Sequence, residues 1–535
     1  MRTLELPEEI RLPKEEIEGF LRRVEATLGE KDHAIARAHV EAVGVLRSAL
    51  ERKGVSIERL KQLLFGSSTE TLDRVLPPPS GPEEKAPEPE RKVKRRRKGH
   101  GRNGVAAYPG ASEVHLAHPT LRSGDSCPCC GRGKVYDTKR PAKDIRFRAQ
   151  PPVEATIYHS QTLRCGLCGE IFRAELPDRA GTKKYDETVG SIIALLKYAS
   201  GMPFYRLEKL QGALGVPLPS ATQWELSAEL AEKCAPLWEA MITMAAQGEL
   251  FHNDDTTARI LEVEKEIREA RERNEEPERT GIYTSGVIAK CGEREITLFF
   301  TGLAHAGENL GAILQRRAPE RSRPIQMSDG LSRNLPADFE TLLASCLTHG
   351  RRHFVDVASS FPQEVRHVLT ELAKVYRLDA RVRRWKLSAD NRLRAHQKYS
   401  QPVMDALRDW LQARIEEKHI EPNSTLGEAI RYVLRRWEAL TLFLREPGAP
   451  LDNTIVERAL KMVILNRKNA YYYRSQRGAR VGDILMSLIS TARSAGVNPF
   501  EYLTAIQRHS DQVRSDPEAW LPWTYQSTLA RLDSS

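Results

Sequence analysis

The stretch "ELFHNDDTTARILEV" at residues 249–263 marks the point where the sequence changes from helical to strand-forming patterns. With "GIYTSGVIAK" at 281–290 and "EITLFFTGLA" at 295–304, it predicts three strands that meander along one sheet. A helix is expected in "HAGENLGAILQRR", a fourth strand in "RPIQMSDG" and a fifth in "TLLASCLTH". This order is typical of an α/β domain with a mixed sheet, and the charged segment 262–280 is expected to be a helical insertion within it.

Two of these predicted strands run directly into an acid: Asp254 follows "LFHN" and Asp329 follows "PIQMS". Strand ends in α/β sheets meet at an edge that is open to ligands. A third acid, Glu457, lies in "APLDNTIVERALKMVILNRKN" at 449–469, which predicts an amphipathic helix. Three carboxylates held together would supply oxygen ligands for two Mg²⁺ or Mn²⁺ ions, an arrangement that drives in-line displacement at a phosphodiester.

Each acid also has an ordinary structural explanation when it is taken alone. An aspartate at a strand end usually belongs to a turn, and Glu457, four residues before Lys461, would usually form a surface ion pair. The abundant Arg and Lys around Glu457 instead favour a site over which a phosphate chain passes. Asp254 and Asp255 are adjacent, and because strand side chains alternate between faces, only one of them is expected to face that site.

The composition favours a nucleic-acid partner. The chain has 535 residues, enough for three or four modules, and 82 Lys and Arg against 72 Asp and Glu give a formal charge of +10. This balance suits a polyanion, with nucleic acid first and an anionic membrane second. No segment approaches the roughly 20 apolar residues of a membrane span, and the start of the chain does not read as a signal peptide. We therefore expect a cytoplasmic protein, and the resemblance described below implies that it is bacterial and nucleoid-associated.

The cysteines predict one zinc site. Cys127-x-x-Cys130 and Cys165-x-x-Cys168 form two pairs in which the second cysteine precedes a glycine. Four thiolates at this spacing can bind one structural Zn²⁺ tetrahedrally, as in a zinc ribbon, with glycine permitting the tight turn. Cys129 lies inside the first pair as a competing ligand, and its role stays open.

The N-terminal segment carries a heptad pattern from residue 14 to about residue 52. It predicts a short coiled coil through which two copies of the chain dimerise. A helical hairpin folded on itself is the alternative, because the alanines in the pattern would make a weak dimer contact. Residues 76–104 are rich in proline and charge and predict a linker. Its basic run at 91–98 is interpreted as a phosphate-binding arm or as a solvated spacer.

Helix starts can be read from the capping residues. Asp452 and Asn453 are expected to cap the helix that carries Glu457, and Ser220 the helix that follows the turn at 215–219. That turn joins two predicted helices as in a helix-turn-helix, whose second helix would enter a major groove. A plain helix pair joined by a proline-containing turn explains the pattern as well.

Aromatic and basic residues alternate in "NRKNAYYYRSQRGAR", directly after the helix of Glu457. Such a stretch suits stacking on splayed bases and clamping of phosphates near a scissile bond. Core aromatics beside a solvated charged face are the structural alternative.

Several motifs together resemble the insertion-sequence sixty-six family of bacterial DDE transposases. They are "HNDDTT", "SDG", "CLTHGRRHF", "DNTIVERALKMVILNRKN" and "LISTARSAGVNPFEYL", and the resemblance extends over nearly the whole chain. The DN-x-x-x-ER block is the most specific of them. The chain departs from the family pattern at Asp255, Thr257 and Leu331, where Glu, Pro and an aromatic residue are usual.

The resemblance implies an RNase H-like catalytic domain that is interrupted by a helical insertion before the last acid. By motif position, Asp254, Asp329 and Glu457 match the three catalytic, metal-binding acids of the family. Cys346-x-x-His349 resembles an element found after the second acid in several transposase groups. The residues expected to support these acids or to contact DNA are Cys346, His349, Arg351, Arg352, Asn453, Arg458, Arg467, Lys468, Tyr472 and Arg474.

The expected function is transposition: cleavage at the ends of a mobile element and joining of the freed 3′-hydroxyl to target DNA. Its partners would be double-stranded DNA (the terminal repeats and the target), a second copy of the chain at least, and helper proteins from the same element. The rivals are a zinc-ribbon and helix-turn-helix regulator without catalysis, and an RNase H-like nuclease without strand transfer. Cut-and-paste and replicative routes are equally compatible with the sequence.

The predicted division of this multidomain α/β chain follows from these segments. It consists of an N-terminal helical or coiled-coil segment (1–75), a basic linker (76–104), a zinc ribbon (105–180), a helical DNA-binding region (181–247), the first part of the catalytic core (248–360), a helical insertion (361–447), the last part of the core (448–510) and a tail (511–535).

Overall fold

The computed structural model describes residues 119–136, 150–164, 171–417 and 420–534, together with Val75, Leu76 and isolated positions between residues 19 and 37. The predicted coiled coil, the linker 76–104 and the pair Cys165 and Cys168 lie outside the described residues. The chain divides into two compact units, residues 79–152 and the remainder. Each unit is described below by itself.

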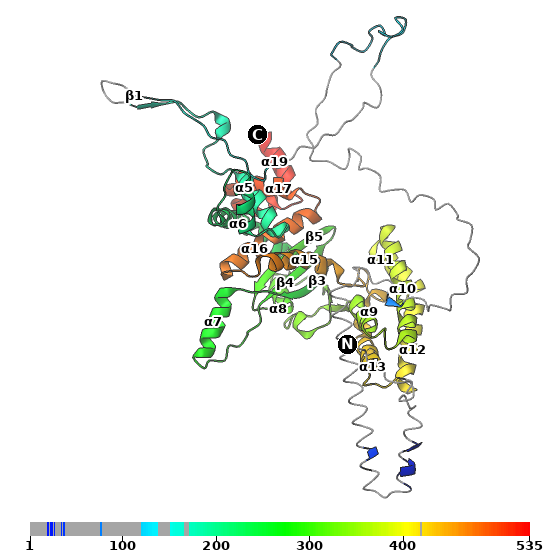
Figure 1. Ribbon diagram of the computed structural model, residues 1–535. Helices are drawn as coiled ribbons and strands as arrows, with labels where there is room; N and C mark the ends of the chain where they lie inside the picture. The colour runs from blue at the N-terminus through cyan, green and yellow to red at the C-terminus, as the bar shows by residue number, and fades with distance from the viewer. Residues whose placement is uncertain are drawn as a thin grey trace, which may run out of the picture. The chain divides into compact units, whose positions relative to one another are not determined.

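A five-stranded mixed sheet forms the centre of the larger unit (Figure 1). Its strand order is β5-β4-β3-β6-β7, so β3 lies in the middle. All five predicted strands are present. They are β3 (Leu250–Thr257), β4 (Tyr283–Cys291), β5 (Arg294–Gly302), β6 (Ile325–Ser328) and β7 (Leu342–Ser345).

Strand β3 changes partners along its length. It pairs antiparallel with β4 from Leu250 to Thr257, but parallel with β6 only from Leu250 to His252. Asp254 therefore lies within β3, beyond the end of its pairing with β6, and not at the end of the strand as the sequence predicted. Asp329 does directly follow the last residue of β6.

Helix α15 (Thr454–Ala470) covers one face of the antiparallel strands, and α16 (Gln476–Ser494) runs along their β5 edge (Figure 1). Helix α6 (Ser220–Ala245) packs on the other face, where Trp238 contacts Phe300 and Glu239 pairs with Arg316. Helix α15 can approach β4 closely because Gly286 has no side chain there. A Cβ atom at Gly286 would lie 3.1 Å from side-chain atoms of Val456 and Leu460. Gly286 is the β4 partner of Asp254, so this close approach brings α15 to the face on which Asp254 lies.

Helix α16 covers the outer edge of β5 with a row of polar side chains. Asp483, Ser487 and Thr491 accept the backbone N–H groups of residues 301, 299 and 297 at 2.7, 2.9 and 3.0 Å. The spacing of these side chains along α16 matches the spacing of the N–H groups along β5, because four helical residues rise about 6 Å and two strand residues about 6.7 Å. The helix thus satisfies edge donors that would otherwise stay unpaired.

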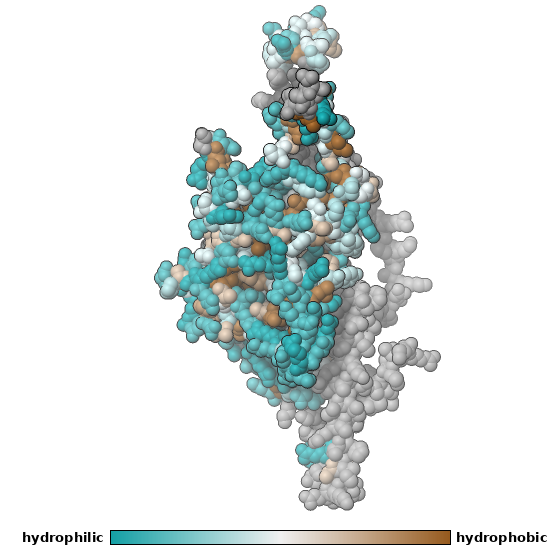
Figure 2. Space-filling view, turned by 90° about the vertical axis from the view of Figure 1, so that its left-hand side faces the viewer, coloured by the Kyte–Doolittle hydropathy of each residue, from teal (hydrophilic) through white to brown (hydrophobic). Residues whose placement is uncertain are grey.

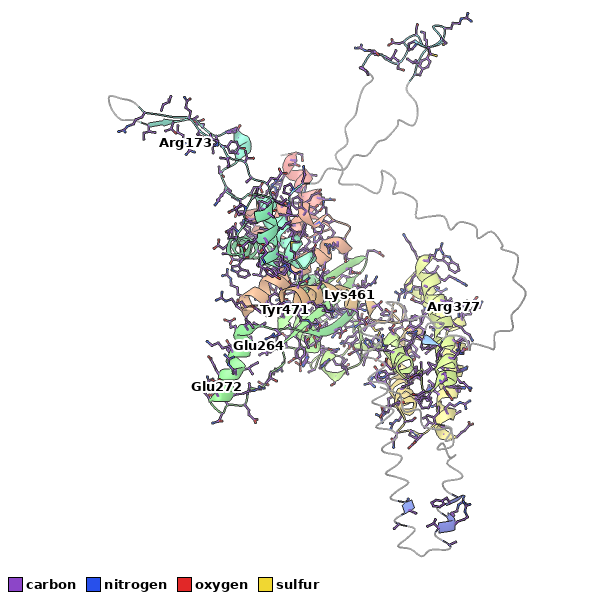
Figure 3. All side chains as sticks on the ribbon, in the orientation of Figure 1. Arg173, Glu264, Glu272, Arg377, Lys461 and Tyr471 are labelled. Carbon is purple, nitrogen blue, oxygen red and sulfur yellow. The ribbon has the colours of Figure 1, made fainter. Side chains whose placement is uncertain are left out.

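Helix α8 (Ala306–Leu314) packs on the opposite face of β3 and β4, and a 3₁₀ turn, η5 (Ser332–Asn334), packs beside it. The charged insertion forms helix α7 (Leu261–Glu272), as predicted, with Glu264 and Glu272 along it (Figure 3).

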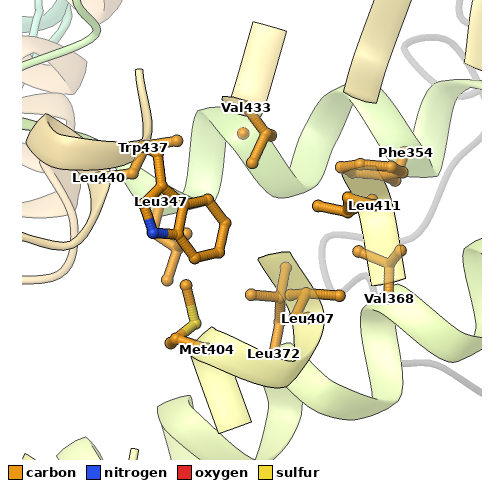
Figure 4. A pocket seen from close by; sticks show the side chains of 11 residues that line it. Leu347, Phe354, Val368, Leu372, Met404, Leu407, Leu411, Val433, Trp437 and Leu440 are labelled. Carbon is orange, nitrogen blue, oxygen red and sulfur yellow. The ribbon is translucent and has the colours of Figure 1, made fainter. Parts of the chain in front are cut away.

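The helical insertion follows β7 directly and has a core of its own. Phe354, Leu372, Leu411 and Trp437 line a small apolar pocket between its helices (Figure 4). This cluster continues under β6 and β7 through Met327 and Ala344, so the insertion is packed against the sheet. Its helices are α9 (Leu347–Asp356), α10 (Pro362–Arg384), α11 (Ala389–Tyr399), α12 (Gln401–Glu416), α13 (Thr425–Arg435) and α14 (Trp437–Leu440), followed by η6 (Leu442–Leu444).

The segments that flank the sheet are mostly helical. A short hairpin of β1 (Thr162–Arg164) and β2 (Ile171–Arg173) precedes helices that pack with the C-terminal helices on α6. These elements are η3 (Asp178–Ala180), α4 (Glu187–Ala194), the π-helical turn η4 (Leu195–Ala199), α5 (Phe204–Ala213), α17 (Pro499–Arg508), α18 (Ser510–Ser515), η7 (Pro517–Trp520) and α19 (Tyr525–Asp533).

Helix α6 does not fit the role of a groove-reading helix. Its residues Leu230, Cys234, Leu237 and Met241 are fully buried in the core against the sheet. The exposed side of its first half carries acids, Glu225, Glu229 and Glu232, which would repel phosphate. Ser220 is the first helical residue rather than the cap, and its hydroxyl donates to Glu208 at 2.5 Å.

The described surface in Figure 2 is mostly hydrophilic, with apolar residues in small separate patches. Among the described helices, none combines the length and the apolar character that crossing a bilayer requires.

Candidate active site

The three predicted acids lie on three elements: Asp254 on β3, Asp329 after β6, and Glu457 on α15. They are near enough for the charges of Asp329 and Glu457 to act on Asp254, while the ligand atoms grouped within 4.8 Å among the described residues are those of Glu457, Cys346 and His349. Burial raises the pKa of Asp254 to about 7, and the negative charges of Asp329 and Glu457 contribute to the same shift. The N–H of Asp255 donates to Asp254 Oδ1 at 2.8 Å and partly opposes it. The residues therefore share one electrostatic environment, although they are separated by up to 203 positions in sequence.

Asp255 points to the other face of the sheet. Its carboxylate accepts hydrogen bonds from Ser285 Oγ at 2.7 Å and from His305 Nδ1 at 2.9 Å. Its side chain is only 2% exposed. The alternation of β3 thus assigns Asp254 to the candidate site and gives Asp255 a structural role between β4 and the start of α8.

Asp329 is held by its local loop and by the insertion. Its Oδ1 accepts hydrogen bonds from the N–H of Leu331 at 2.9 Å and from Asn334 Nδ2 at 2.8 Å. Its carbonyl accepts a hydrogen bond from the Tyr432 hydroxyl of α13 at 3.1 Å. Gly330 follows with φ of 79°, a left-handed conformation that explains the glycine of the "SDG" motif.

A buried amide network supports Asp329 from beneath the sheet. Gln326 Nε2 donates to Asn253 Oδ1 at 3.0 Å, and both amides donate to the Asn334 carbonyl at 2.7 Å. Asn334 in turn holds Asp329, so β3, β6 and η5 are locked together behind the acid. The sequence analysis missed these amides because, taken singly, a buried Asn or Gln carries no motif.

Asn453 joins α15 to β3. Its side chain does not cap the helix as predicted; it donates to the Asn253 carbonyl at 3.0 Å and accepts from His252 Nδ1 at 3.0 Å. Asp452 provides the turn instead, by accepting from the N–H and hydroxyl of Thr454. Because Asn453 is fully buried, it positions Glu457 one turn later and does not contact DNA.

Cys346 and His349 lie beside Glu457. His349 Nδ1 is 4.0 Å from Glu457 Oε1, and one ligand atom from each of these three residues lies within 4.8 Å of the others. Cys346 is buried, and burial raises the pKa of its thiol to about 11. The Asn453 N–H donates to its sulfur at 3.2 Å. Both residues thus lie beside the third acid, and the supporting or DNA-contacting role expected of them stays a prediction.

Arg467 at the end of α15 is occupied within the protein. Its guanidinium donates to the hydroxyls of Thr256 at 3.2 Å and Thr257 at 2.5 Å, which fixes the end of β3. Arg352 pairs with Asp356 at 3.4 Å, and Arg351 is half-buried on the same helix. Arg467 and Arg352 therefore have contacts within the protein, and their expected role of supporting the acids or contacting DNA stays a prediction.

The aromatic stretch after α15 divides between surface and core. Tyr471 and Tyr472 are 65% and 49% exposed, whereas Tyr473 is packed inside and accepts a hydrogen bond from Asn466 at 3.1 Å. Tyr471 has φ of 66° and, with Lys461, marks the surface of α15 in Figure 3. The remaining predicted contacts are exposed cations along this surface: Arg458, Lys468 and Arg474.

A second basic surface lies on the insertion, where α10 ends. The residues Arg381, Arg384, Trp385 and Lys386 are all exposed, and we call them the basic tip. Trp385 is 62% exposed with the Arg381 guanidinium 5.8 Å from its ring centroid. In the sequence this surface is marked only by closely spaced arginines.

The smaller unit contains the first cysteine pair. The Cys127 N–H donates to the Gly133 carbonyl and its carbonyl accepts from Gly131, which closes a tight turn with Gly131 at φ of 64°. Backbone N–H groups of Gly133 and Arg132 lower the pKa of the Cys130 thiol. This turn favours a metal thiolate, and Cys129 and Cys130 are both exposed.

The donor set of the main site suits hard divalent cations. Its ligands are carboxylate oxygens, and the forces that raise the pKa of Asp254 are burial and other carboxylates. A cation would relieve this repulsion, and oxygen ligands select Mg²⁺ or Mn²⁺. The residues present therefore fit a divalent-metal site.

Comparisons with known proteins agree with this geometry. The family described as "Transposase IS66 family" matches residues 184–481, a segment that contains all three acids. Two similar proteins of Sinorhizobium fredii (strain NBRC 101917 / NGR234) carry the names "Uncharacterized protein y4jD" and "Uncharacterized protein y4hP". The first is 25% identical over 88% of this chain and 93% of its own length, and the second is 23% identical over 79% and 77%. Since the family match covers more than half of the 535 residues, this protein belongs to the IS66 family of transposases.

Proposed function

We propose that this transposase cleaves the ends of an insertion element and joins them to target DNA by DDE phosphoryl transfer. The observation that carries the proposal is the shared electrostatic environment of Asp254, Asp329 and Glu457. The sheet order, with three antiparallel strands beside two parallel ones, supports an RNase H-like core.

In the proposed site, Asp254, Asp329 and Glu457 hold two Mg²⁺ or Mn²⁺ ions. Such ions supply activation of a nucleophile and stabilisation of a leaving oxygen when they are bound. The protein contributes rigidity: Asn334 and Tyr432 fix Asp329, and Asn453 fixes the start of α15. Carboxylates held in this way need little reorganisation during the reaction.

DNA would be bound by exposed cations on both sides of the acids. Arg458, Lys468 and Arg474 lie on or after α15, and Tyr472 offers an exposed ring for stacking on an unpaired base. The basic tip adds phosphate contacts from the insertion. We place the active protein on bacterial DNA, with two copies holding the two element ends and helper proteins of the element beside them.

The two cysteine pairs would bind one structural zinc ion. Cys127 and Cys130 provide two thiolates on a tight turn, and Cys165 and Cys168 are assigned as the other two ligands from their matching spacing. We expect one equivalent of zinc in the purified chain, and its loss in Cys130→Ser.

A cleavage assay on DNA that contains the element ends tests the function. Wild-type protein with Mg²⁺ should nick the ends, and Asp329→Ala should bind the same DNA without nicking it. Binding without nicking by the wild type would instead support a regulator. Nicking without joined products in a strand-transfer assay would support a nuclease.

A further inference from the structure

We propose that Cys346, His349 and Glu457 form a second kind of metal site, for a borderline or soft cation such as Zn²⁺, and that its occupancy inhibits the enzyme. The inhibitory part rests on the proposed function, since Glu457 is a ligand that the Mg²⁺ site also needs. The binding part stands on the geometry of the three side chains alone.

Distances within this cluster are close to those of a filled site. Ligand atoms of the three residues lie within 4.8 Å of one another, and His349 Nδ1 is 4.0 Å from Glu457 Oε1. Nitrogen and oxygen ligands of a tetrahedral zinc ion are roughly 3.4 Å apart, and sulfur is roughly 3.6 Å from either. Side-chain movements of about 1 Å would therefore close the site around an ion.

The local backbone also suits a metal ligand pair. Cys346 precedes the first residue of the ten-residue helix α9, and His349 lies within the first turn, so both side chains leave the helix at the same end. The Asn453 N–H donates to the Cys346 sulfur at 3.2 Å, which would stabilise a thiolate. His349 Nδ1 is a buried atom with no hydrogen-bond partner among the described residues.

The ligand types separate this site from the carboxylate site. A thiolate and an imidazole favour Zn²⁺, Co²⁺ or Cd²⁺ over Mg²⁺, and three protein ligands leave a fourth position for water. Binding replaces the proton of the Cys346 thiol, which is released to solvent. A bound ion would hold Glu457 on the α9 side and neutralise the charge that it now presents to Asp254.

Cadmium titration of the full chain, with its zinc ribbon already loaded with Zn²⁺, tests binding directly. The thiolate-to-cadmium absorption should show one more equivalent in wild type than in Cys346→Ser. Cys291→Ser is the matched control: Cys291 is a partly buried thiol whose sulfur donates to the Met244 carbonyl, and this variant should keep the extra equivalent. Equal stoichiometry in wild type and Cys346→Ser overturns the proposal.

Because Cys346 is buried, Cys346→Ser could lose metal binding through misfolding. A second variant, at His349, therefore tests the site independently. His349 is partly exposed, so His349→Gln should fold normally. It should weaken Cd²⁺ binding by more than the roughly 10- to 100-fold that loss of a group supporting a ligand costs, because a direct ligand is removed. Unchanged affinity in this variant also overturns the site.

The inhibition assay separates the two proposals. With Mg²⁺ present, Zn²⁺ should inhibit DNA nicking by the wild type and inhibit His349→Gln at least about tenfold less strongly, in line with its weaker binding. If the wild type binds the extra Cd²⁺ but never nicks DNA, the proposed function fails while the metal site stands. If nicking is normal and Zn²⁺ inhibits both proteins equally, the inhibitory site fails.

Discussion

Asp254 and Asp255 are neighbours on one strand, yet they have opposite environments. Asp255 is enclosed by Ser285 and His305, which donate hydrogen bonds to both of its oxygens. Asp254 faces two further acids, and the N–H of Asp255 is the hydrogen-bond donor to its carboxylate. The difference shows how one strand can carry a carboxylate that stabilises the fold beside one that is kept ready for a ligand.

The largest expected effect is on activity, at Asp254. Asp254→Asn should lower the rate of Mg²⁺-dependent nicking by on the order of 10³-fold or more, because several kcal/mol of charge stabilisation are lost. Its stability in Mg²⁺-free buffer should stay equal or rise, since repulsion among the acids is reduced. Urea unfolding and a nicking assay together check both parts, and a strongly destabilised variant would contradict the assignment.

For Asp255 we expect a large effect on stability and a small effect on activity. Asp255→Ala should destabilise the protein by about 2–4 kcal/mol, because it leaves Ser285 and His305 without their partner in a buried site. Nicking by the fraction that remains folded should fall far less than in Asp254→Asn. A comparable loss of activity at full stability would assign Asp255 to the reaction and break the comparison.

Asp254 should also make the stability of the protein depend on pH. The folded-state pKa of Asp254, about 7, lies above the unfolded value near 3.8, so the native state binds more protons between these values. Its contribution therefore lowers the stability of the Mg²⁺-free protein as pH rises from about 4 to 7.

The matched measurement is the difference between wild type and Asp254→Asn. Asp483 shifts in the same direction and His252 in the opposite one, and both are present in the two proteins. The wild type should lose stability relative to the variant across this window, and Mg²⁺ should reduce the difference. Parallel stability curves would show that Asp254 does not titrate there.

A smaller effect is expected for a substitution of Asn453, which connects the start of α15 to β3. Asn453→Ala removes its hydrogen bonds to His252 and the Asn253 carbonyl and should cost about 1–3 kcal/mol. Activity should fall with it, because Glu457 is on the first turn of the same helix. Ile455→Ala on that turn is the control: similar destabilisation without an equal loss of kcat would confirm a positioning role for Asn453.

The smallest effects are expected at the exposed cations. Arg384→Ala in the basic tip should weaken DNA binding at all sequences and reduce the slope of log affinity against log salt by about 1. Arg273→Ala, on the exposed connection after α7, removes the same charge from an arginine that is already paired with Glu275 and should leave the slope unchanged. Equal slopes for all three proteins would remove the basic tip from the DNA-binding surface.

Much of the catalytic region was predictable from the sequence because its signals are local. Alternating apolar runs predicted the five strands, and the family resemblance pointed to Asp254, Asp329 and Glu457 before any contact was known. Strand alternation correctly separated Asp254 from Asp255.

The remaining features depend on contacts between distant segments, which no local pattern encodes. Asn453 was expected to cap its helix, but β3 offers it a buried carbonyl and a histidine 200 positions away. Arg467 was expected to support the acids or to contact DNA, and no local pattern predicted its hydrogen bonds to Thr256 and Thr257 at the end of β3. Helix α6 reads as part of a helix-turn-helix, while its apolar side is buried against the sheet.

The row of Asp483, Ser487 and Thr491 along β5 has a consequence for assembly. These side chains occupy the N–H groups through which a strand from another molecule would have to dock. Intermolecular sheet extension is therefore blocked at this border of the sheet. A second subunit that joins there must do so through side-chain packing on the outer surface of α16. An extended peptide cannot pair with β5 at these positions, because their N–H groups are already hydrogen-bonded.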